Sequence, residues 1–287
     1  MSQIVKAFSW NVNGLRAVVN RGDLQKFIQE FSPDILALQE TKLNATQLQE
    51  LKLAELFPDY QMFWSFAERK GYAGTALWVK TNLLNPTHED CQDAPTACLE
   101  PNAHKNSPLV SFYEECAECQ SLADQYGDAM GEGRLTAVMI GETLFVSLYS
   151  PNGKDDLSRI PLRVKYDAHV NNLLKPFSRV LLMGDFNVAN EPIDVANPQS
   201  KKGVHGFTEE ERSGFKNYLA AGLKDVWREE NPEKVAYTWW SFRVRERGLN
   251  GWRIDYTLAK GIDARNAAIH QVVKGSDHCP ISVEVKI

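Results

Sequence analysis

Short apolar segments spread along the whole chain constrain its fold most strongly, because they alternate with segments of helical character. Five of them have the length and the composition of β-strands: Ile4–Trp10, Ile35–Leu38, Leu144–Tyr149, Val180–Met183 and 281–287. Between the first two, Leu24, Phe27, Ile28 and Phe31 follow the spacing of an amphipathic helix. Because strands and helices intermix over all 287 residues, the sequence predicts a layered α/β architecture.

Polar groups with no obvious part in a core stand where the first four strand-like segments end, and in two later motifs, Gly251–Tyr256 and Gly275–Pro280. These groups are Asn11, Asn13, Glu40, Tyr149, Asn152, Asp185, Asn187, Asp255, Asp277 and His278. Taken singly, each motif is explained by a turn or a helix cap. A buried polar group left unpaired costs about 1–3 kcal/mol, so together they predict one site at a sheet edge. Carboxylate and amide oxygens suit a hard cation such as Mg²⁺.

Seven strings in the chain carry a family resemblance: FSWNVNGLRA, PDILALQETK, YSPNG, LLMGDFNVA, GFTEEER, GWRIDY and GSDHCPI. In this order they resemble the exonuclease III and apurinic/apyrimidinic (AP) endonuclease family of the endonuclease/exonuclease/phosphatase superfamily, over residues 4–83 and 133–287. The resemblance implies a single DNase I-like domain spanning 1–287, a four-layered α/β sandwich of two mixed sheets flanked by helices. It also implies a Mg²⁺-dependent DNA repair nuclease, with Mn²⁺ as a possible substitute.

The resemblance implies a reaction and a set of residue roles. The enzyme would hydrolyse the phosphodiester 5′ to abasic sites in double-stranded DNA, with 3′–5′ exonuclease and 3′-end-cleaning activity. The metal ligands would be Asn11, Asn13, Glu40 and Asp277. The catalytic residues would be Tyr149, Asp185, Asn187, Asp255 and His278, with Asn152 binding the phosphate. The number of metal ions, and whether Tyr149 acts as phenolate or neutral donor, stay open.

A slot for a sugar without its base is implied at Trp239, Trp252 and Ile254, although the tryptophans could equally fill a core. Nearby, Arg243, Arg245 and Arg247 alternate, so they project to one side of an extended segment, toward DNA or toward solvent. Two features depart from the family. The loop before GFT reads Lys201-Lys202-Gly203-Val204-His205, and Asp155 stands where some relatives have a DNA-intercalating arginine.

Residues 84–132 form a predicted insertion that is rich in acidic side chains and cysteines. Ten acidic groups and Lys105 give it a charge of −9, which leaves +4 for the rest of a chain whose total is −5. That mild excess of positive charge permits binding to nucleic acid without demanding it. Four cysteines could hold structural zinc, stay as thiols or form disulfides: Cys91, Cys98, Cys116 and Cys119.

The sequence contains neither a membrane-spanning apolar run nor a signal-peptide core, so a cytoplasmic protein is expected. A monomer is the default expectation, since no sequence feature indicates an oligomeric state. Two other functions share parts of this pattern. One is a phosphodiesterase of the same fold that acts on a non-DNA phosphate ester, such as an inositol phosphate or sphingomyelin. The other is a nucleic-acid-binding relative that has lost cleavage, which predicts eroded site residues.

Overall fold

The computed structural model describes residues 3–84, 122–125, 127–241, 248 and 250–287. Most of the predicted insertion lies outside these described residues. The four cysteines of the zinc hypothesis, Cys91, Cys98, Cys116 and Cys119, lie outside them as well, and so does Arg243. Those assignments stay predictions.

One sheet has six strands among the described residues, in the order β12-β13-β1-β2-β4-β3. Their bounds are β1 (Ile4–Asn11), β2 (Ile35–Gln39), β3 (Tyr60–Ser65), β4 (Thr75–Lys80), β12 (Asp263–Ile269) and β13 (Ile281–Lys286). Strands β1 and β2 run parallel, and the other neighbours run antiparallel. The central β2 is wholly buried and so is β1 from Ala7 onward, as expected for strands covered on both faces.

The second sheet has the order β10-β11-β9-β8-β7. Its strands are β7 (Leu135–Ile140), β8 (Thr143–Tyr149), β9 (Val180–Asp185), β10 (Lys224–Asp225) and β11 (Asp255–Lys260). Here β8 and β9 form the parallel pair. Near the predicted insertion, β5 (Ala123–Asp124) and β6 (Gly127–Asp128) make a short separate ladder, followed by a 3₁₀ turn at Ala129–Glu132.

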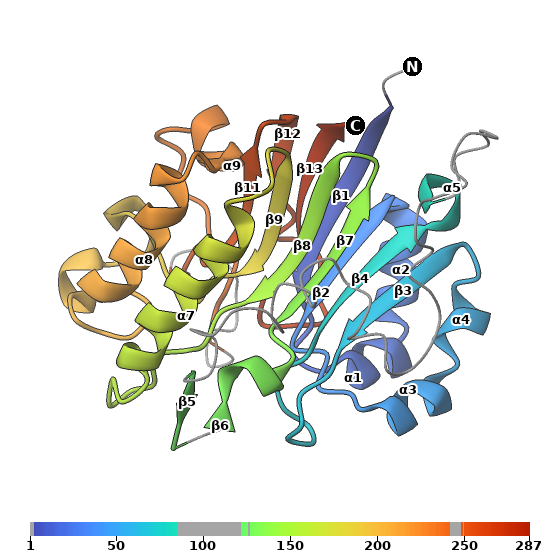
Figure 1. Ribbon diagram of the computed structural model, residues 1–287, viewed down its shortest axis with the longest axis horizontal. Coiled ribbons are helices and arrows are strands. Elements are labelled where there is room, and N and C mark those ends of the chain that lie inside the picture. Colours follow the sequence, from blue (N-terminus) through green and yellow to red (C-terminus); the bar gives the residue numbers. More distant parts are fainter. Residues whose placement is uncertain (1–2, 85–121, 126, 242–247, 249) are drawn as a thin grey trace.

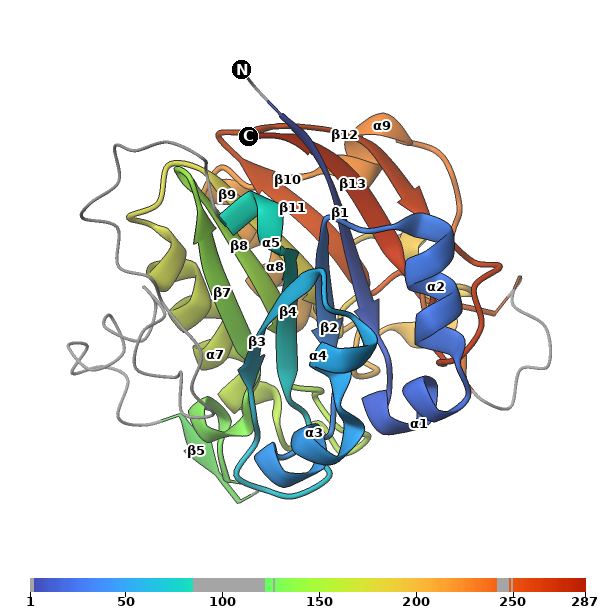
Figure 2. The ribbon, with the colours of Figure 1, turned by 90° about the vertical axis from the view of Figure 1, so that its right-hand side faces the viewer.

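Helices cover the outer faces of both sheets (Figures 1 and 2). Over the first sheet lie α1 (Leu15–Asn20), α2 (Asp23–Phe31), α3 (Ala45–Leu51) and α4 (Leu53–Leu56), and over the second lie α7 (Ile160–Leu174) and α8 (Glu209–Ala220). Two short helices, α5 (Thr81–Leu84) and α9 (Val226–Glu230), and 3₁₀ turns at Pro192–Asp194 and Pro198–Lys201 complete the described elements.

The apolar core is divided into layers that match this arrangement. Between the two sheets, side chains such as Val5 and Ile35 of the first pack with Phe145 and Leu181 of the second. Separate clusters join each sheet to its own helices. The predicted four-layered sandwich of two mixed sheets flanked by helices is therefore confirmed. Within the described ranges, no helix combines the length and apolar character needed to cross a bilayer.

Gly184 allows β9 to lie close to β8 just before Asp185. Its φ is 149°, and a Cβ atom there would lie 1.9 Å from the carbonyl oxygen of Leu148. No larger residue fits without moving one of the two strands. The glycine of the GDFN motif thus sets the position of the carboxylate that follows it.

Candidate active site

The chain brings its predicted site residues together where strands of both sheets end or begin. On the second sheet, Tyr149 is the register partner of Asp185, and Asp185 is the partner of Asp255. Strands β8 and β9 end at this edge, whereas the antiparallel β11 begins there. On the first sheet, Asn11 ends β1 beside Gln39, which ends β2. One edge of the sandwich therefore collects polar side chains from distant parts of the sequence.

Asn11 connects two carboxylates that come from different sheets. Its Nδ2 donates to Oε1 of Glu40 at 2.9 Å and to Oδ2 of Asp185, also at 2.9 Å. Ligand atoms of Glu40, Asp185 and His278 all lie within 4.8 Å of one another. Two largely buried carboxylates this close repel each other, so a cation between them is stabilising, and oxygen donors suit Mg²⁺. The side chains present therefore fit a magnesium ion.

A buried polar bridge lies just behind this cluster and also joins the two sheets. Nε2 of Gln39, at the end of β2, donates to Oγ of Ser147 on β8 at 3.0 Å. The hydroxyl of Ser147 donates in turn to the carbonyl oxygen of Leu38 at 3.1 Å, and Ser9 donates to Oε1 of Gln39 at 3.2 Å. Hydrogen bonds are directional, so this bridge fixes how the sheets align beside the site.

Lys42 belongs to the site, although sequence reasoning gave it no role. Glu40 and Lys42 have φ angles of 51° and 53°, in the left-handed region that residues with a side chain rarely adopt. This turn places Nζ of Lys42 2.9 Å from Oε2 of Glu40, and Nζ also donates to Oδ1 of Asn13. Burial would raise the pKa of Glu40, but the Lys42 cation and the Asn11 amide outweigh it and hold that pKa below its usual value.

His278 lies between two acidic groups of the second sheet. Its Nδ1 donates to Oδ2 of Asp255 at 2.9 Å, and its Nε2 lies 3.8 Å from Oδ2 of Asp185. Burial opposes protonation of the ring, but Asp255 and Asp185 outweigh it and raise the pKa of His278. Burial also raises the pKa of Asp185, and the nearby charges of Asp255 and Glu40 add to that rise. The imidazolium form is therefore favoured, with Nε2 toward the carboxylate cluster.

The site extends toward Tyr149 through Asn187 and Asn152. The backbone N–H of Asn187 donates to Oδ1 of Asp185 at 2.8 Å, and its side chain donates to the carbonyl oxygen of Ser150 at 2.9 Å. Nδ2 of Asn152 donates to Oδ1 of Asn187 at 3.1 Å. The turn after β9, in which Asn187 has a φ of 48°, thus links Asp185 to the turn after β8. Burial raises the pKa of Tyr149 well above its ordinary value, so its hydroxyl is neutral.

Asp277 and Asn13 form a second polar group that meets the first through Lys42. One carboxylate oxygen of Asp277 accepts from Nδ2 of Asn13 at 2.9 Å, and the other accepts from Nε1 of Trp239 at 3.0 Å. Asn13 therefore contacts both Asp277 and Lys42. The arrangement places these two residues beside the cluster, and their role as metal ligands stays a prediction.

The residues of the predicted slot lie next to His278. Trp239, Trp252 and Ile254 pack in one apolar cluster with Phe207, and the rings of Trp239 and His278 are 6.5 Å apart. Trp239 and Trp252 stay partly exposed, whereas core tryptophans such as Trp10 are fully buried. A purely core role would predict full burial for both. Partial exposure beside the polar cluster favours a binding surface.

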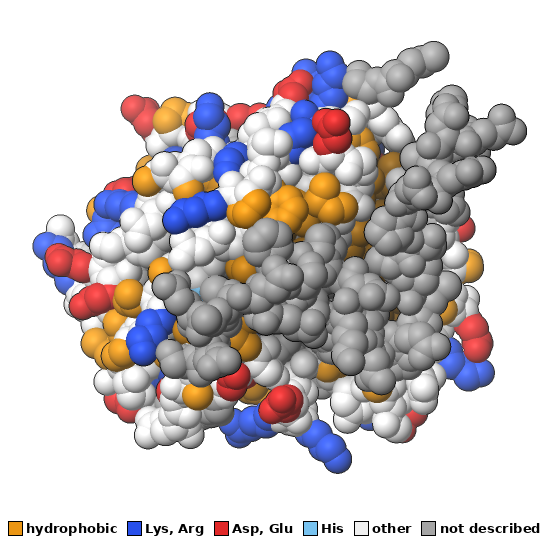
Figure 3. Space-filling model, viewed as in Figure 1, with side chains coloured by type: hydrophobic (Ala, Val, Ile, Leu, Met, Phe, Trp, Pro, Cys, Tyr) orange, Lys and Arg blue, Asp and Glu red, His pale blue; other side chains and the backbone are white. Residues whose placement is uncertain are grey.

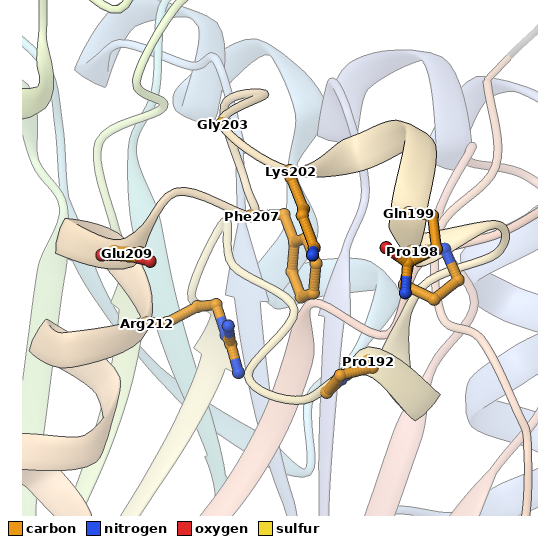
Figure 4. A pocket seen from close by; sticks show the side chains of 8 residues that line it. All are labelled: Pro192, Pro198, Gln199, Lys202, Gly203, Phe207, Glu209 and Arg212. Atoms are coloured by element: carbon orange, nitrogen blue, oxygen red, sulfur yellow. The ribbon is translucent and has the colours of Figure 1, made fainter.

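A pocket of about 200 Å³ lies beside this slot and shares Phe207 with it (Figure 4). Its lining residues are Pro192, Pro198, Gln199, Lys202, Gly203, Phe207, Glu209 and Arg212. None of the residues predicted to be catalytic is among them, so the pocket is separate from the carboxylate cluster. Within the cluster, Asn11, Asp185 and His278 are buried, and Glu40 is partly exposed.

The two departures from the family lie close to each other at the rim of the site. Asp155 is fully exposed, and its Oδ1 lies 3.3 Å from Nδ1 of His205. Nζ of Lys201 lies 5.6 Å from the ring centre of Trp252, so one of the two loop lysines reaches the slot. Over the described surface in Figure 3, lysine and arginine side chains are interspersed with acidic ones rather than gathered in one patch.

A buried ionic cluster supports the segment before β11 that carries Trp252 and Ile254. Oδ1 of Asp194 accepts from Nε of Arg253 at 2.7 Å and from Nη2 of Arg228 at 2.5 Å. Nη2 of Arg253 also donates to Asp225 at 2.7 Å. Arg253 is buried, so its position fixes its neighbours Trp252 and Ile254 on either side.

Replacing Asp194 by asparagine is expected to lower the free energy of unfolding by about 3–5 kcal/mol, because the buried Arg253 would lose one of its two carboxylate partners. Arg253 and Arg228 overcome burial and lower the pKa of Asp194, so its contribution is present above the usual carboxyl pKa of about 3.9 and is lost as pH falls through the lower folded value. Urea unfolding of wild type and variant across this pH range tests both effects. Equal stabilities at pH 7 would contradict them, and the exposed Asp59→Asn provides the control.

Comparisons with known proteins agree with this geometry. Residues 8–278 match the family described as the Endonuclease/Exonuclease/phosphatase family. The chain is 33% identical to the exodeoxyribonuclease of Bacillus subtilis, covering 99% of this chain and all of that one. It is also 33% identical to the DNA repair nuclease APEX1 of Danio rerio, covering 97% and 81%. The AP endonuclease from Leishmania major has a similar structure, with a TM-score of 0.78 and 25% identity over 99% of this chain and 88% of that one.

Proposed function

The chain belongs to the exonuclease III and AP endonuclease family of phosphodiester hydrolases, and from that premise we propose that it is a Mg²⁺-dependent DNA repair nuclease. Its reaction would be hydrolysis of the phosphodiester 5′ to abasic sites, together with removal of nucleotides and blocking groups from 3′ ends. The observation that carries this proposal is the contact of Asn11 with Glu40 and Asp185, with His278 opposite.

Glu40 would be the main ligand of the metal ion, with Asn11 lining the same site. Bound there, Mg²⁺ would supply Lewis-acid neutralisation of the phosphate charge. Glu40 stays ionised because its pKa is lowered, so it can hold a cation at neutral pH. The ammonium group of Lys42 adds a positive charge beside Oε2 of Glu40. A phosphate anion therefore meets a site that can attract it even though the whole chain is negative.

The chain's own residues would divide the proton transfers between them. Asp185 can accept a proton from the attacking water, since its raised pKa makes it a stronger base than an ordinary carboxylate. His278 as imidazolium would donate a hydrogen bond to a phosphate oxygen, and Asp255 holds the ring in the required orientation. Tyr149 would act as a neutral donor to the phosphate and to the leaving 3′ oxygen as its bond to phosphorus breaks, with Asn152 and Asn187 binding the remaining phosphate oxygens.

The partly exposed slot supports a substrate in which a sugar lacks its base. Trp239, Trp252 and Ile254 offer an apolar surface beside His278, where a flipped abasic sugar would pack and a normal nucleotide would not fit as well. A related enzyme for lipid or inositol phosphates would not need this surface. A binding protein without activity would not need the intact polar cluster.

Cleavage assays on duplex DNA and on non-DNA phosphate esters test the proposal. With Mg²⁺, a duplex with one abasic site should be cut 5′ to that site about 10²-fold faster than the same duplex with an intact base, because a missing base removes several kcal/mol of unstacking and pairing. EDTA should abolish cleavage, and Mg²⁺ should restore it. Faster turnover of sphingomyelin or an inositol phosphate than of abasic DNA would overturn the proposal.

The variant Trp252→Ala tests the slot separately from the chemistry. Removing the ring should lower kcat/KM on abasic duplex about tenfold or more, a typical value for lost apolar contacts in a specificity pocket. Removal of a 3′-phosphate, which needs no abasic sugar in the slot, should fall less. Trp64→Ala on β3 is a matched control, since Trp64 is also partly buried. Equal losses on both substrates would mean that Trp252 serves structure alone.

A further inference from the structure

We propose that Arg134 is a positioning residue that holds Tyr149 in place for the reaction. The inference rests on the proposed function, in which Tyr149 binds the phosphate. Arg134 directly precedes β7, and the pairing of Leu135 with Leu148 places it across from Tyr149 at the end of β8. No sequence motif pointed to this arginine. Its side chain is only 1% exposed, so it is not placed to track the DNA backbone itself.

Arg134 contacts Tyr149 in three ways that together fix both its backbone and its ring. Nη1 of Arg134 donates to the carbonyl oxygen of Tyr149 at 3.1 Å. The backbone N–H of Tyr149 donates to the carbonyl oxygen of Arg134 at 2.8 Å. The guanidinium carbon lies 4.7 Å from the centre of the phenol ring. A buried cation over an aromatic ring is a favourable contact that also restrains the ring.

The guanidinium is itself held by groups from other elements. Its Nε donates to Oε2 of Glu132 at 2.5 Å, and its Nη2 donates to the hydroxyl of Tyr72 at 3.0 Å. Arg159, at the start of α7, donates to the other oxygen of Glu132 at 2.7 Å, to the same Tyr72 hydroxyl at 3.0 Å and to Asp124 at 2.8 Å. The two arginines and two carboxylates balance in charge, which is the condition for keeping such a cluster buried.

This geometry explains why an arginine is needed and a lysine would not serve. The planar guanidinium donates in three directions, to Glu132, to Tyr72 and to the backbone of Tyr149, while its face covers the phenol ring. A lysine keeps the charge but loses the fixed directions and the flat surface. A reacting group misplaced by about 1 Å can lose on the order of 10²-fold in rate, so a loosened Tyr149 has a large effect.

A double-mutant cycle separates positioning from a merely structural role. Arg134→Lys, Tyr149→Phe and the double variant are compared in single-turnover cleavage of abasic duplex with Mg²⁺. We expect Arg134→Lys to lower kcat by about 10-fold to 10²-fold with little change in KM. In the Tyr149→Phe background the same substitution should have less than a twofold further effect. Arg179→Lys is the control, because Arg179 donates to Thr143 at the far end of the second sheet, and it should change kcat less than threefold.

The possible outcomes distinguish this inference from the proposed function. If Tyr149→Phe lowers kcat but Arg134→Lys lowers it further by the same factor in both backgrounds, Arg134 does not act through Tyr149, and the inference fails while the proposed function stands. If Tyr149→Phe has no effect, the role of Tyr149 fails and the inference with it. Should Arg134→Lys not fold, Glu132→Gln removes the partner that orients Arg134. We expect Glu132→Gln to lower kcat in the wild-type background and to have no further effect in the Tyr149→Phe background. A further loss of activity in the Tyr149→Phe background would overturn the inference.

Discussion

Replacing Asp185 by asparagine is expected to lower kcat on abasic duplex by about 10³-fold to 10⁴-fold, the upper range for loss of a general base. Asparagine keeps the shape of the side chain and an oxygen that can accept from the backbone N–H of Asn187. It removes the negative charge and the ability to take a proton from water. Asn11 would also face one ionised partner, Glu40, instead of two. The fold should stay intact, since the apolar layers do not depend on this charge.

Single-turnover cleavage and thermal unfolding of Asp185→Asn decide between a chemical and a structural effect. The melting temperature should stay close to that of the wild type, while the cleavage rate falls. Asp263→Asn, an exposed aspartate at the start of β12, makes the same chemical change away from the site and should leave the rate unchanged. A loss of less than tenfold in Asp185→Asn would contradict its assignment as the base.

Replacing Asp255 by asparagine should lower kcat by about 10²-fold to 10³-fold at mildly alkaline pH, the range for losing a preorganised donor to developing charge. Asp255 is the first of three carboxylates that raise the pKa of His278, and it accepts from Nδ1. Without that charge the pKa of His278 falls by about 1–3 units, the usual effect of an opposite charge at this distance. The imidazolium needed for phosphate binding is then lost at a lower pH.

The pH dependence of kcat tests the direction of this pKa change. Activity that needs protonated His278 persists as pH rises until the raised pKa is passed, so the wild type has its alkaline decline at high pH. In Asp255→Asn the decline should move toward lower pH, and in His278→Gln that titration should be absent. An unchanged alkaline decline in Asp255→Asn would show that His278 is not the group that titrates.

The fold and most of the candidate site could be predicted from the sequence because both depend on local patterns. Apolar segments of strand length end at Asn11, Tyr149 and Asp185, and parallel strands place such ends at one edge of a sheet. Convergence of Asp255 and His278 with them could be expected from motif order and the family resemblance. The register that makes Asp255 the neighbour of Asp185 is a property of the folded sheet.

Lys42 and Arg134 could not be assigned a role from the sequence, for two different reasons. Lys42 reaches Glu40 only because both residues adopt left-handed backbone angles, which no residue type at those positions signals. Arg134 reaches Tyr149 through the pairing of β7 with β8, and it follows a predicted insertion that obscures where β7 begins. Both contacts depend on the tertiary structure, and from the sequence alone a charged side chain is expected to lie in solvent.

The polar bridge through Gln39 and Ser147 limits how far the two sheets can shift relative to each other beside the site. Apolar surfaces can slide past each other at small cost, whereas a donor and an acceptor on opposite sheets lose their bond when displaced by an ångström or so. The sandwich is therefore pinned at the edge where Asn11 joins Glu40 to Asp185, whereas apolar side chains fill most of the layer between the two sheets. Side chains far from that edge can repack without disturbing the chemistry, because the two halves of the active centre are aligned locally.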